Sequence, residues 1–193
     1  LANRTVAETI GTALNKTSKK AKTFVYRVHD QPTTDKLMSL AGMASRFGHK
    51  MPAVGNNKVI SQGINKLMKD IHDRPEENLL STLAIRSMAK AVYTTQNIGH
   101  YGLAFDYYTH FTSPIRRYPD TMVHRLLDRY LNNGGRSVPG IQFEEYCKHC
   151  SDMEQTAAQA ERASIKYKQA EYLKDRLGEV FEGTVSGVSE WGF

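Results

Sequence analysis

Helical periodicity is the feature that most restricts how this chain can fold. Apolar residues recur three or four positions apart along separate segments, which places them on one face of an α-helix. The pattern predicts helices over residues 2–16, 34–47, 58–71, 75–90, 119–131 and, as two helices broken after Cys150, 142–177. Short stretches rich in β-branched and aromatic residues predict strands at 24–28, 91–94 and 103–105. The expected fold class is therefore mainly α with a small β element (α+β).

Two helix boundaries depend on specific residues. Ser151 is followed three positions later by Glu154, which is the spacing of a capping box, and the pair predicts a new helix after Cys150. Pro75 should take the first position of helix 75–90, because the first turn of a helix does not need that amide hydrogen. The residues of this helix that are expected to face the core are Leu79, Leu83 and Met88.

The composition restricts the class of function. Among 193 residues, 26 Lys and Arg face 20 Asp and Glu, which gives a formal net charge of +6 and an isoelectric point near 9.3. Polyanions such as nucleic acid or an acidic lipid surface are therefore the natural partners. No apolar run approaches the roughly 18–20 residues that cross a bilayer, so a membrane-spanning protein is excluded. With two cysteines, a disulfide framework is also excluded, and a cytoplasmic location is expected.

Segment 109–120 concentrates the residues that can carry chemistry. It holds two hydroxyls, a proline suited to a helix start and two adjacent arginines: Thr112, Ser113, Pro114, Arg116 and Arg117. Free backbone N–H groups at a helix start favour phosphate, and a guanidinium can bind two phosphate oxygens. The segment therefore predicts an anion site. Pro119 should divide it into a single turn and a longer helix.

The run His100-Tyr-Gly-Leu-Ala-Phe-Asp-Tyr-Tyr-Thr-His-Phe-Thr-Ser-Pro-Ile-Arg-Arg-Tyr-Pro-Asp120 resembles the signature of the ribonuclease II (RNB) family. Further agreement follows in the family's order, at residues 1–8, 26–30, 123–127, 149–151 and 160–162. The tail from Val180 resembles the first strand of an S-one-type OB-fold, an RNA-binding module. The expected domains are 1–178, the C-terminal half of an RNB catalytic domain, and 179–193, the truncated start of an OB-fold.

The resemblance implies processive 3′-to-5′ hydrolysis of single-stranded RNA to nucleoside 5′-monophosphates, with magnesium held by a cluster of aspartates. It makes Arg116 the catalytic residue, which stabilises charge developing on the phosphoryl group. It makes Thr112, Ser113 and Arg117 candidates to hold nearby phosphates or the loop itself. Glu161 falls where the family places a carboxylate that contacts the terminal nucleotides.

The family's aspartate-rich motif does not occur between residues 1 and 193. The nearest clustered ligands are Asp70, His72 and Asp73, which are commonplace at a helix end. We therefore expect no magnesium ligands in this chain, a missing N-terminal half of the catalytic domain, and no activity of the isolated chain. The apolar surface that the missing half would cover should favour self-association.

Two other functions fit parts of the sequence. A noncatalytic RNA-binding or scaffolding fragment would bind RNA without magnesium, in a salt-sensitive manner and without turnover. A basic helical DNA-binding module would prefer duplexes, but no motif favours it.

Several further residues have a simple interpretation. A zinc site at Cys147 and Cys150 would need a second close pair of ligands, which is absent from the sequence. His110 and His124 are expected to be structural. Lys16, Lys19, Lys20 and Lys22 could contact an RNA backbone or simply form a solvated loop. Trp191 and Phe193 resemble the aromatic strand end with which OB-folds stack bases, or they are disordered without the rest of the barrel.

Overall fold

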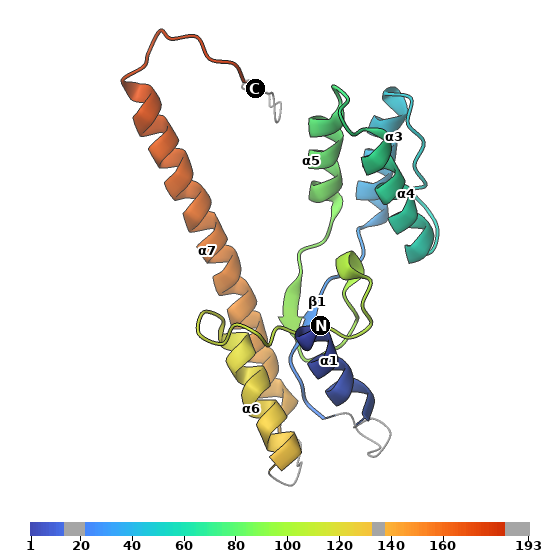
Figure 1. Cartoon of the computed structure of the whole chain (residues 1–193), viewed down its shortest axis with the longest axis vertical. Helices are drawn as coiled ribbons and strands as arrows, with labels where there is room; N and C mark the ends of the chain where they lie inside the picture. Colours follow the sequence, from blue (N-terminus) through green and yellow to red (C-terminus); the bar gives the residue numbers. More distant parts are fainter. Residues whose placement is uncertain (14–21, 133–137, 184–193) are drawn as a thin grey trace. The chain divides into compact units, whose positions relative to one another are not determined.

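The computed structural model describes residues 1–13, 22–132 and 138–183 (Figure 1). These residues are mainly helical and contain a two-stranded sheet, which confirms the expected fold class. The chain divides into two compact units, one formed by Leu1–Asp30 with Lys90–Gly178 and the other by Gln31–Ala89 with Glu179–Phe193. Lys16, Lys19, Lys20, Trp191 and Phe193 lie outside the described residues, as does most of the predicted OB-fold strand.

The first unit combines a small sheet with helices. Its elements are α1 (Ala2–Glu8), the π-helical turn η1 (Thr9–Ala13), β1 (Tyr26–Val28), β2 (Val92–Thr94), the 3₁₀ turn η2 (Tyr101–Leu103), α6 (Tyr118–Asn132) and α7 (Gly140–Lys174). The two strands are antiparallel, with Arg27 opposite Tyr93. No helix among the described residues is both long and apolar enough to cross a membrane.

The helix predicted over 2–16 is helical through Ala13, and residues 14–16 lie outside the described part of the chain, whereas the strand predicted at 103–105 is wrong. The helix expected over 2–16 is α-helical to Glu8 and then widens, and the Thr12 hydroxyl bonds the Glu8 carbonyl in the widened turn. The strand expected at 103–105 is instead the end of a 3₁₀ turn, followed by an isolated bridge at Phe105. Ala104 has a φ of 54°, which is the left-handed region, so this residue cannot continue an extended strand.

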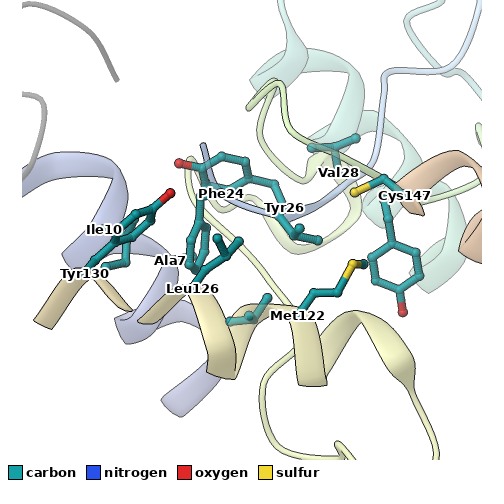
Figure 2. Close-up of a cluster of buried hydrophobic side chains, with 12 residues drawn as sticks. Ala7, Ile10, Phe24, Tyr26, Val28, Met122, Leu126, Tyr130 and Cys147 are labelled. Atoms are coloured by element: carbon teal, nitrogen blue, oxygen red, sulfur yellow. The ribbon is translucent and has the colours of Figure 1, made fainter. Parts of the chain in front are cut away.

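The core of the first unit lies between the sheet, α1 and α6. Figure 2 shows Phe24, Tyr26 and Leu126 within this cluster. Phe24 is fully buried, and its ring meets the Tyr26 ring edge to face with 5.3 Å between centroids. The buried members are Ala7, Ile10, Phe24, Val25, Tyr26, Val28, Tyr93, Met122, Val123, Leu126, Tyr130 and Cys147.

Side chains of α7 bond the edge of β2 that does not face β1. Ser151 Oγ accepts the Tyr93 N–H at 2.9 Å and donates to the Cys147 carbonyl at 2.9 Å. The Glu144 carboxylate accepts the Thr95 N–H at 2.6 Å and also the Thr95 hydroxyl. These contacts satisfy backbone groups that a strand edge otherwise leaves unpaired.

The predicted break after Cys150 is therefore wrong. Helix α7 is continuous from Gly140 to Lys174, as Figure 1 shows. The Ser151 hydroxyl is engaged with the Cys147 carbonyl and the sheet, so it does not cap a new helix. Glu154 forms an ion pair with Arg27 instead of completing a capping box.

The second unit contains the helices α3 (Thr34–Arg46), α4 (Asn57–Asp70) and α5 (Glu77–Ser87). After α3 the chain turns at Gly48, whose φ of 82° lies in the left-handed region that favours glycine. The buried side chains of these helices form two small apolar clusters. The first consists of Leu40, Ala44, Leu67, Ile71, Leu80 and Ala84, and the second of Leu37, Ile60 and Ile64.

The prediction for α5 was partly wrong. Its first helical residue is Glu77, so Pro75 lies before the helix rather than at its first position. Leu79 is 40% exposed, whereas Leu80 is fully buried. The buried face also includes Ser87, whose hydroxyl donates to the Ala84 carbonyl at 2.7 Å and so satisfies its polar group.

Candidate functional site

A single turn before α6 presents the two adjacent arginines. The Ser113 carbonyl accepts the amides of Arg116 at 3.3 Å and Arg117 at 3.1 Å. Helix α6 then begins at Tyr118, which confirms the division into a turn and a longer helix that Pro119 predicted. The turn therefore places Arg116 immediately before a rigid element of the core.

The buried side chain of Asp120 accepts hydrogen bonds from this turn. The carboxylate is fully buried, and its Oδ2 accepts the Ser113 N–H at 2.8 Å and an Arg117 Nη2–H at 2.9 Å. The free amides predicted at this helix start are not found at Ser113, Arg116 and Arg117, whose N–H groups are bonded within the protein. These three amides are therefore not available to an anion, and the exposed group that the turn offers is the Arg116 side chain.

Asp120 was not among the residues predicted to form the site. An acidic residue three positions after an arginine on a helix is a common surface pair. The signal that could have identified it is its place on the inner face of α6, two positions before Met122 and three before Val123, both of which are buried.

Arg116 lies on a hollow of about 440 Å³ between the turn and α7. Its side chain is exposed, and no described residue accepts a hydrogen bond from its guanidinium. The hollow is lined by Tyr93, Arg116, Arg117, Tyr118, Pro119, Cys150, Met153, Glu154 and Ala157.

The other charged groups around this hollow have partners. Arg117 is paired with Asp120, and Glu154 accepts two bonds from Arg27, at 2.6 Å and 3.2 Å. The Arg27 guanidinium also lies 4.5 Å from the centroid of the Tyr93 ring, as a cation–π contact. Among the charged described residues that line the hollow, Arg116 is thus the one that retains an uncompensated charge.

Tyr93, which also contacts Arg27, is hydrogen-bonded to a neutral histidine. The Tyr93 hydroxyl lies 2.8 Å from His110 Nδ1. Burial raises the pKa of Tyr93 to about 12. Burial, together with the positive charges of Arg117 and Arg27, lowers the pKa of His110 to about 4. Both side chains are neutral near pH 7, and His110 has the structural hydrogen bond that the sequence analysis expected.

The remaining predicted residues are distributed as follows. Thr112 is exposed, and Ser113 is half-buried with its amide bonded to Asp120. Glu161 is exposed on α7, seven residues beyond Glu154, and it does not line the hollow. The structure therefore brings Arg116 and Arg117 to one hollow and leaves Thr112 and Glu161 outside it.

His124 has the structural contacts that the sequence analysis expected. Its Nε2 lies 2.7 Å from the Phe111 carbonyl oxygen. The His124 and Phe111 rings also stack, with 4.0 Å between their centroids.

A second hollow, of about 630 Å³, lies between the sheet and α7. Its wall is mainly apolar and includes Val92 and Ile141, while Glu145 and Asp152 contribute negative charge. Carboxylates repel phosphate, so this hollow suits an anionic ligand less well than the hollow at Arg116.

One group of described residues could hold a metal ion. Its ligand atoms, which lie within 4.8 Å of one another, belong to His72, Asp73 and Glu77. Asp70, which the sequence grouped with His72 and Asp73, is not part of this group. His72 and Asp73 are exposed and Glu77 is half-buried, and the group offers an imidazole, whereas magnesium prefers an octahedron of oxygens. Glu154, on the hollow at Arg116, is already bonded to Arg27.

The cysteines are buried to different degrees. Burial raises the pKa of Cys147 to about 12 and also raises that of Cys150. Both are therefore thiols near neutral pH.

Comparison with known proteins identifies the family. The RNB domain model matches residues 1–133, and the chain belongs to this family. Ribonuclease R of Aquifex aeolicus is 40% identical over 173 residues, which cover 88% of this chain and 24% of that protein. Ribonuclease R of Thermotoga maritima is 38% identical over 198 residues, 99% of this chain and 26% of that protein. The chain thus spans about a quarter of the length of these ribonuclease R relatives.

Solved structures agree with this assignment. Mycoplasma genitalium RNase R in complex with ribose methylated single-stranded RNA has a TM-score of 0.82 at 29% identity. The match covers 99% of this chain and 30% of that one. Yeast Ssd1, described as a pseudonuclease, has a TM-score of 0.59 at 28% identity, over 78% of this chain and 18% of that one.

We expect His110 to make the stability of the first unit depend on pH. Its folded pKa of about 4 lies below the ordinary value of 6.5, so between these values the unfolded chain binds a proton that the folded chain does not. Stability should therefore fall as the pH drops from about 6.5 to about 4, and His110 should contribute no pH dependence above this range. Thermal unfolding followed at several pH values would measure this.

In the same measurement, His110→Gln should lower the melting temperature, and the decrease at pH 7 should be similar to the decrease at pH 8. Below pH 6.5 its curve should be flatter than that of the wild type. Curves that stay parallel down to pH 4.5 would contradict the assignment to His110.

Proposed function

We propose that this chain is part of an exoribonuclease that removes nucleotides from the 3′ end of single-stranded RNA and releases nucleoside 5′-monophosphates. The observation that carries the proposal is the uncompensated guanidinium of Arg116 on a hollow of an RNB-family domain. RNA as the polyanion is supported by relatives, since Mycoplasma genitalium RNase R has been solved with ribose methylated single-stranded RNA and with double-stranded RNA.

The local geometry suits a role for Arg116 at the scissile phosphate. A guanidinium is always charged and can donate two parallel hydrogen bonds to phosphate oxygens. Such a donor accelerates hydrolysis when it bonds more strongly to the charge that develops in the transition state. Because Asp120 and Arg27 compensate Arg117 and Glu154, Arg116 supplies the positive charge of the hollow.

The other site residues have subsidiary roles in this proposal. Thr112 and Ser113 contribute hydroxyls to neighbouring phosphates, and Arg117 holds the loop rather than the ligand, since it is bonded to Asp120. Glu161 contacts the terminal nucleotides from α7.

The whole enzyme would act in the cytoplasm, and its magnesium would be held by residues outside this chain. Residues 179–193 would begin its OB-fold. The isolated chain would be inactive and would tend to associate with itself through exposed apolar side chains, among them Ile85 and Ile141.

The test is degradation of 5′-labelled single-stranded RNA by the purified chain, with magnesium and with a chelator. The same assay is run on the chain fused to the preceding part of the domain from a ribonuclease R relative. We expect no shortening by the chain alone, and magnesium-dependent, stepwise shortening from the 3′ end by the fusion. Magnesium-dependent shortening by the chain alone, lost in Arg116→Ala, would contradict the proposed inactivity.

A noncatalytic RNA-binding role is the second candidate, because one structural relative is a pseudonuclease. This role requires the fusion to bind labelled RNA with an affinity that falls as salt rises. It also requires the fusion to release no mononucleotide in the presence of magnesium.

A further inference from the structure

We propose that Asp120 is a positioning residue that determines which of two adjacent arginines faces the ligand. The inference rests on the proposed function of Arg116. It concerns a residue that does not itself contact RNA and that acts through the turn from Ser113 to Arg117.

The two bonds to Asp120 flank Arg116 along the chain. Oδ2 accepts the Ser113 amide at 2.8 Å, three residues before Arg116, and the guanidinium of Arg117 at 2.9 Å, the residue after it. Hydrogen bonds to a carboxylate are stronger than those between neutral groups, and these are removed from water because Asp120 is fully buried. Asp120 therefore holds the backbone before Arg116 and the side chain of the residue after it.

A second contact from α6 supports the same turn. The Thr121 hydroxyl donates to the Pro114 carbonyl at 3.2 Å. The Asp120 amide also donates to the Arg117 carbonyl at 3.2 Å. With both ends of the turn bonded to one helix, the Arg116 side chain extends from a rigid support, as a group that must meet a developing charge requires.

Asp120 also makes the two arginines unequal. The Arg117 side chain is 21% exposed and its charge is compensated, whereas Arg116 is exposed and uncompensated. A neutral residue at position 120 would leave Arg117 without its carboxylate beside the same hollow. Either arginine could then bind a phosphate, so the dependence of binding on Arg116 alone would decrease.

The first measurement is hydrogen exchange of individual backbone amides in the full chain. Asp120→Asn should accelerate exchange of the Ser113 amide by about tenfold or more, because its charged acceptor is lost. The Tyr93 amide, which Ser151 holds on β2, should exchange at the wild-type rate and so exclude general unfolding. The matched control is Asp128→Asn on the same helix, an exposed carboxylate bonded to Asn132, which should alter neither amide.

The second measurement is the affinity for a 5′-labelled oligouridylate, by fluorescence anisotropy at one ionic strength and with chelator present. Arg116→Ala should weaken binding by about tenfold in the wild-type background, as expected for the loss of one charged phosphate contact. In the Asp120→Asn background the same substitution should weaken binding by less than about threefold, because coupled residues give non-additive effects.

The outcomes separate the two proposals. If Arg116→Ala does not weaken binding in the wild type, the proposed role of Arg116 fails, whatever Ser113 exchange shows. If Arg116→Ala weakens binding equally in both backgrounds, Arg116 binds RNA but Asp120 does not position it, and the further inference alone is overturned. An unchanged Ser113 exchange rate in Asp120→Asn would overturn it as well.

Discussion

Replacing Arg116 with alanine should slow RNA cleavage by the fused, magnesium-binding protein by about 100–1,000-fold, the usual loss when one donor to a developing oxyanion is removed. The physical reason is that Arg116 is the charged residue of its hollow that no described carboxylate compensates. Single-turnover release of mononucleotides measures the chemical step directly.

Two further variants refine this expectation. Arg116→Lys keeps the charge but loses the planar pair of donors, so its rate should fall between those of the wild type and the alanine variant. Arg125→Ala removes an exposed arginine of α6 that does not line the hollow, and it should leave the rate nearly unchanged. Equal losses in Arg116→Ala and Arg125→Ala would show that the effect comes from net charge alone.

Replacing Phe24 with alanine should reduce the free energy of unfolding of the first unit by about 3–5 kcal/mol, the range for a fully buried phenylalanine. The ring packs against Tyr26 within the cluster of Figure 2, and its removal leaves a cavity that the flanking strand and helices cannot fill. Urea unfolding followed by circular dichroism measures the change.

The matched control is Phe47→Ala at the end of α3. Phe47 is 44% exposed, so the same substitution should cost less than about 1 kcal/mol. A small loss in Phe24→Ala, similar to that in Phe47→Ala, would contradict the described packing of the first unit.

Apolar periodicity predicted the helices whose buried faces consist of apolar side chains. In α6, Met122, Val123 and Leu126 are buried as their spacing indicated. Periodicity did not predict that Ser87 and Ser151 are buried. Each serine hydroxyl donates to a carbonyl of the preceding turn, so the residue can lie on the inner face of its helix. A hydropathy pattern treats such a residue as exposed.

The sequence predicted the arginines of the candidate site but not the carboxylates of its ion pairs. The resemblance to the family assigned the catalytic role to Arg116 and a supporting role to Arg117. The residue types alone could not distinguish the two arginines, because their difference in charge compensation depends on the buried carboxylate of Asp120. The pair between Arg27 and Glu154 joins residues 127 positions apart, and no local pattern signals such a contact. The catalytic role of Arg116 and the nucleotide contact of Glu161 stay predictions.

The contacts of α7 with the sheet have a consequence for length changes in this protein. Ser151 and Glu154 fix the helix along its axis through Tyr93 and Arg27. Since a helix rises about 1.5 Å per residue, Glu161 stands roughly 10 Å beyond Glu154, and one inserted residue between them would rotate Glu161 by about 100°. If Glu161 contacts the nucleotides as proposed, exposed side chains between positions 154 and 161 can be exchanged far more freely than their number can be changed.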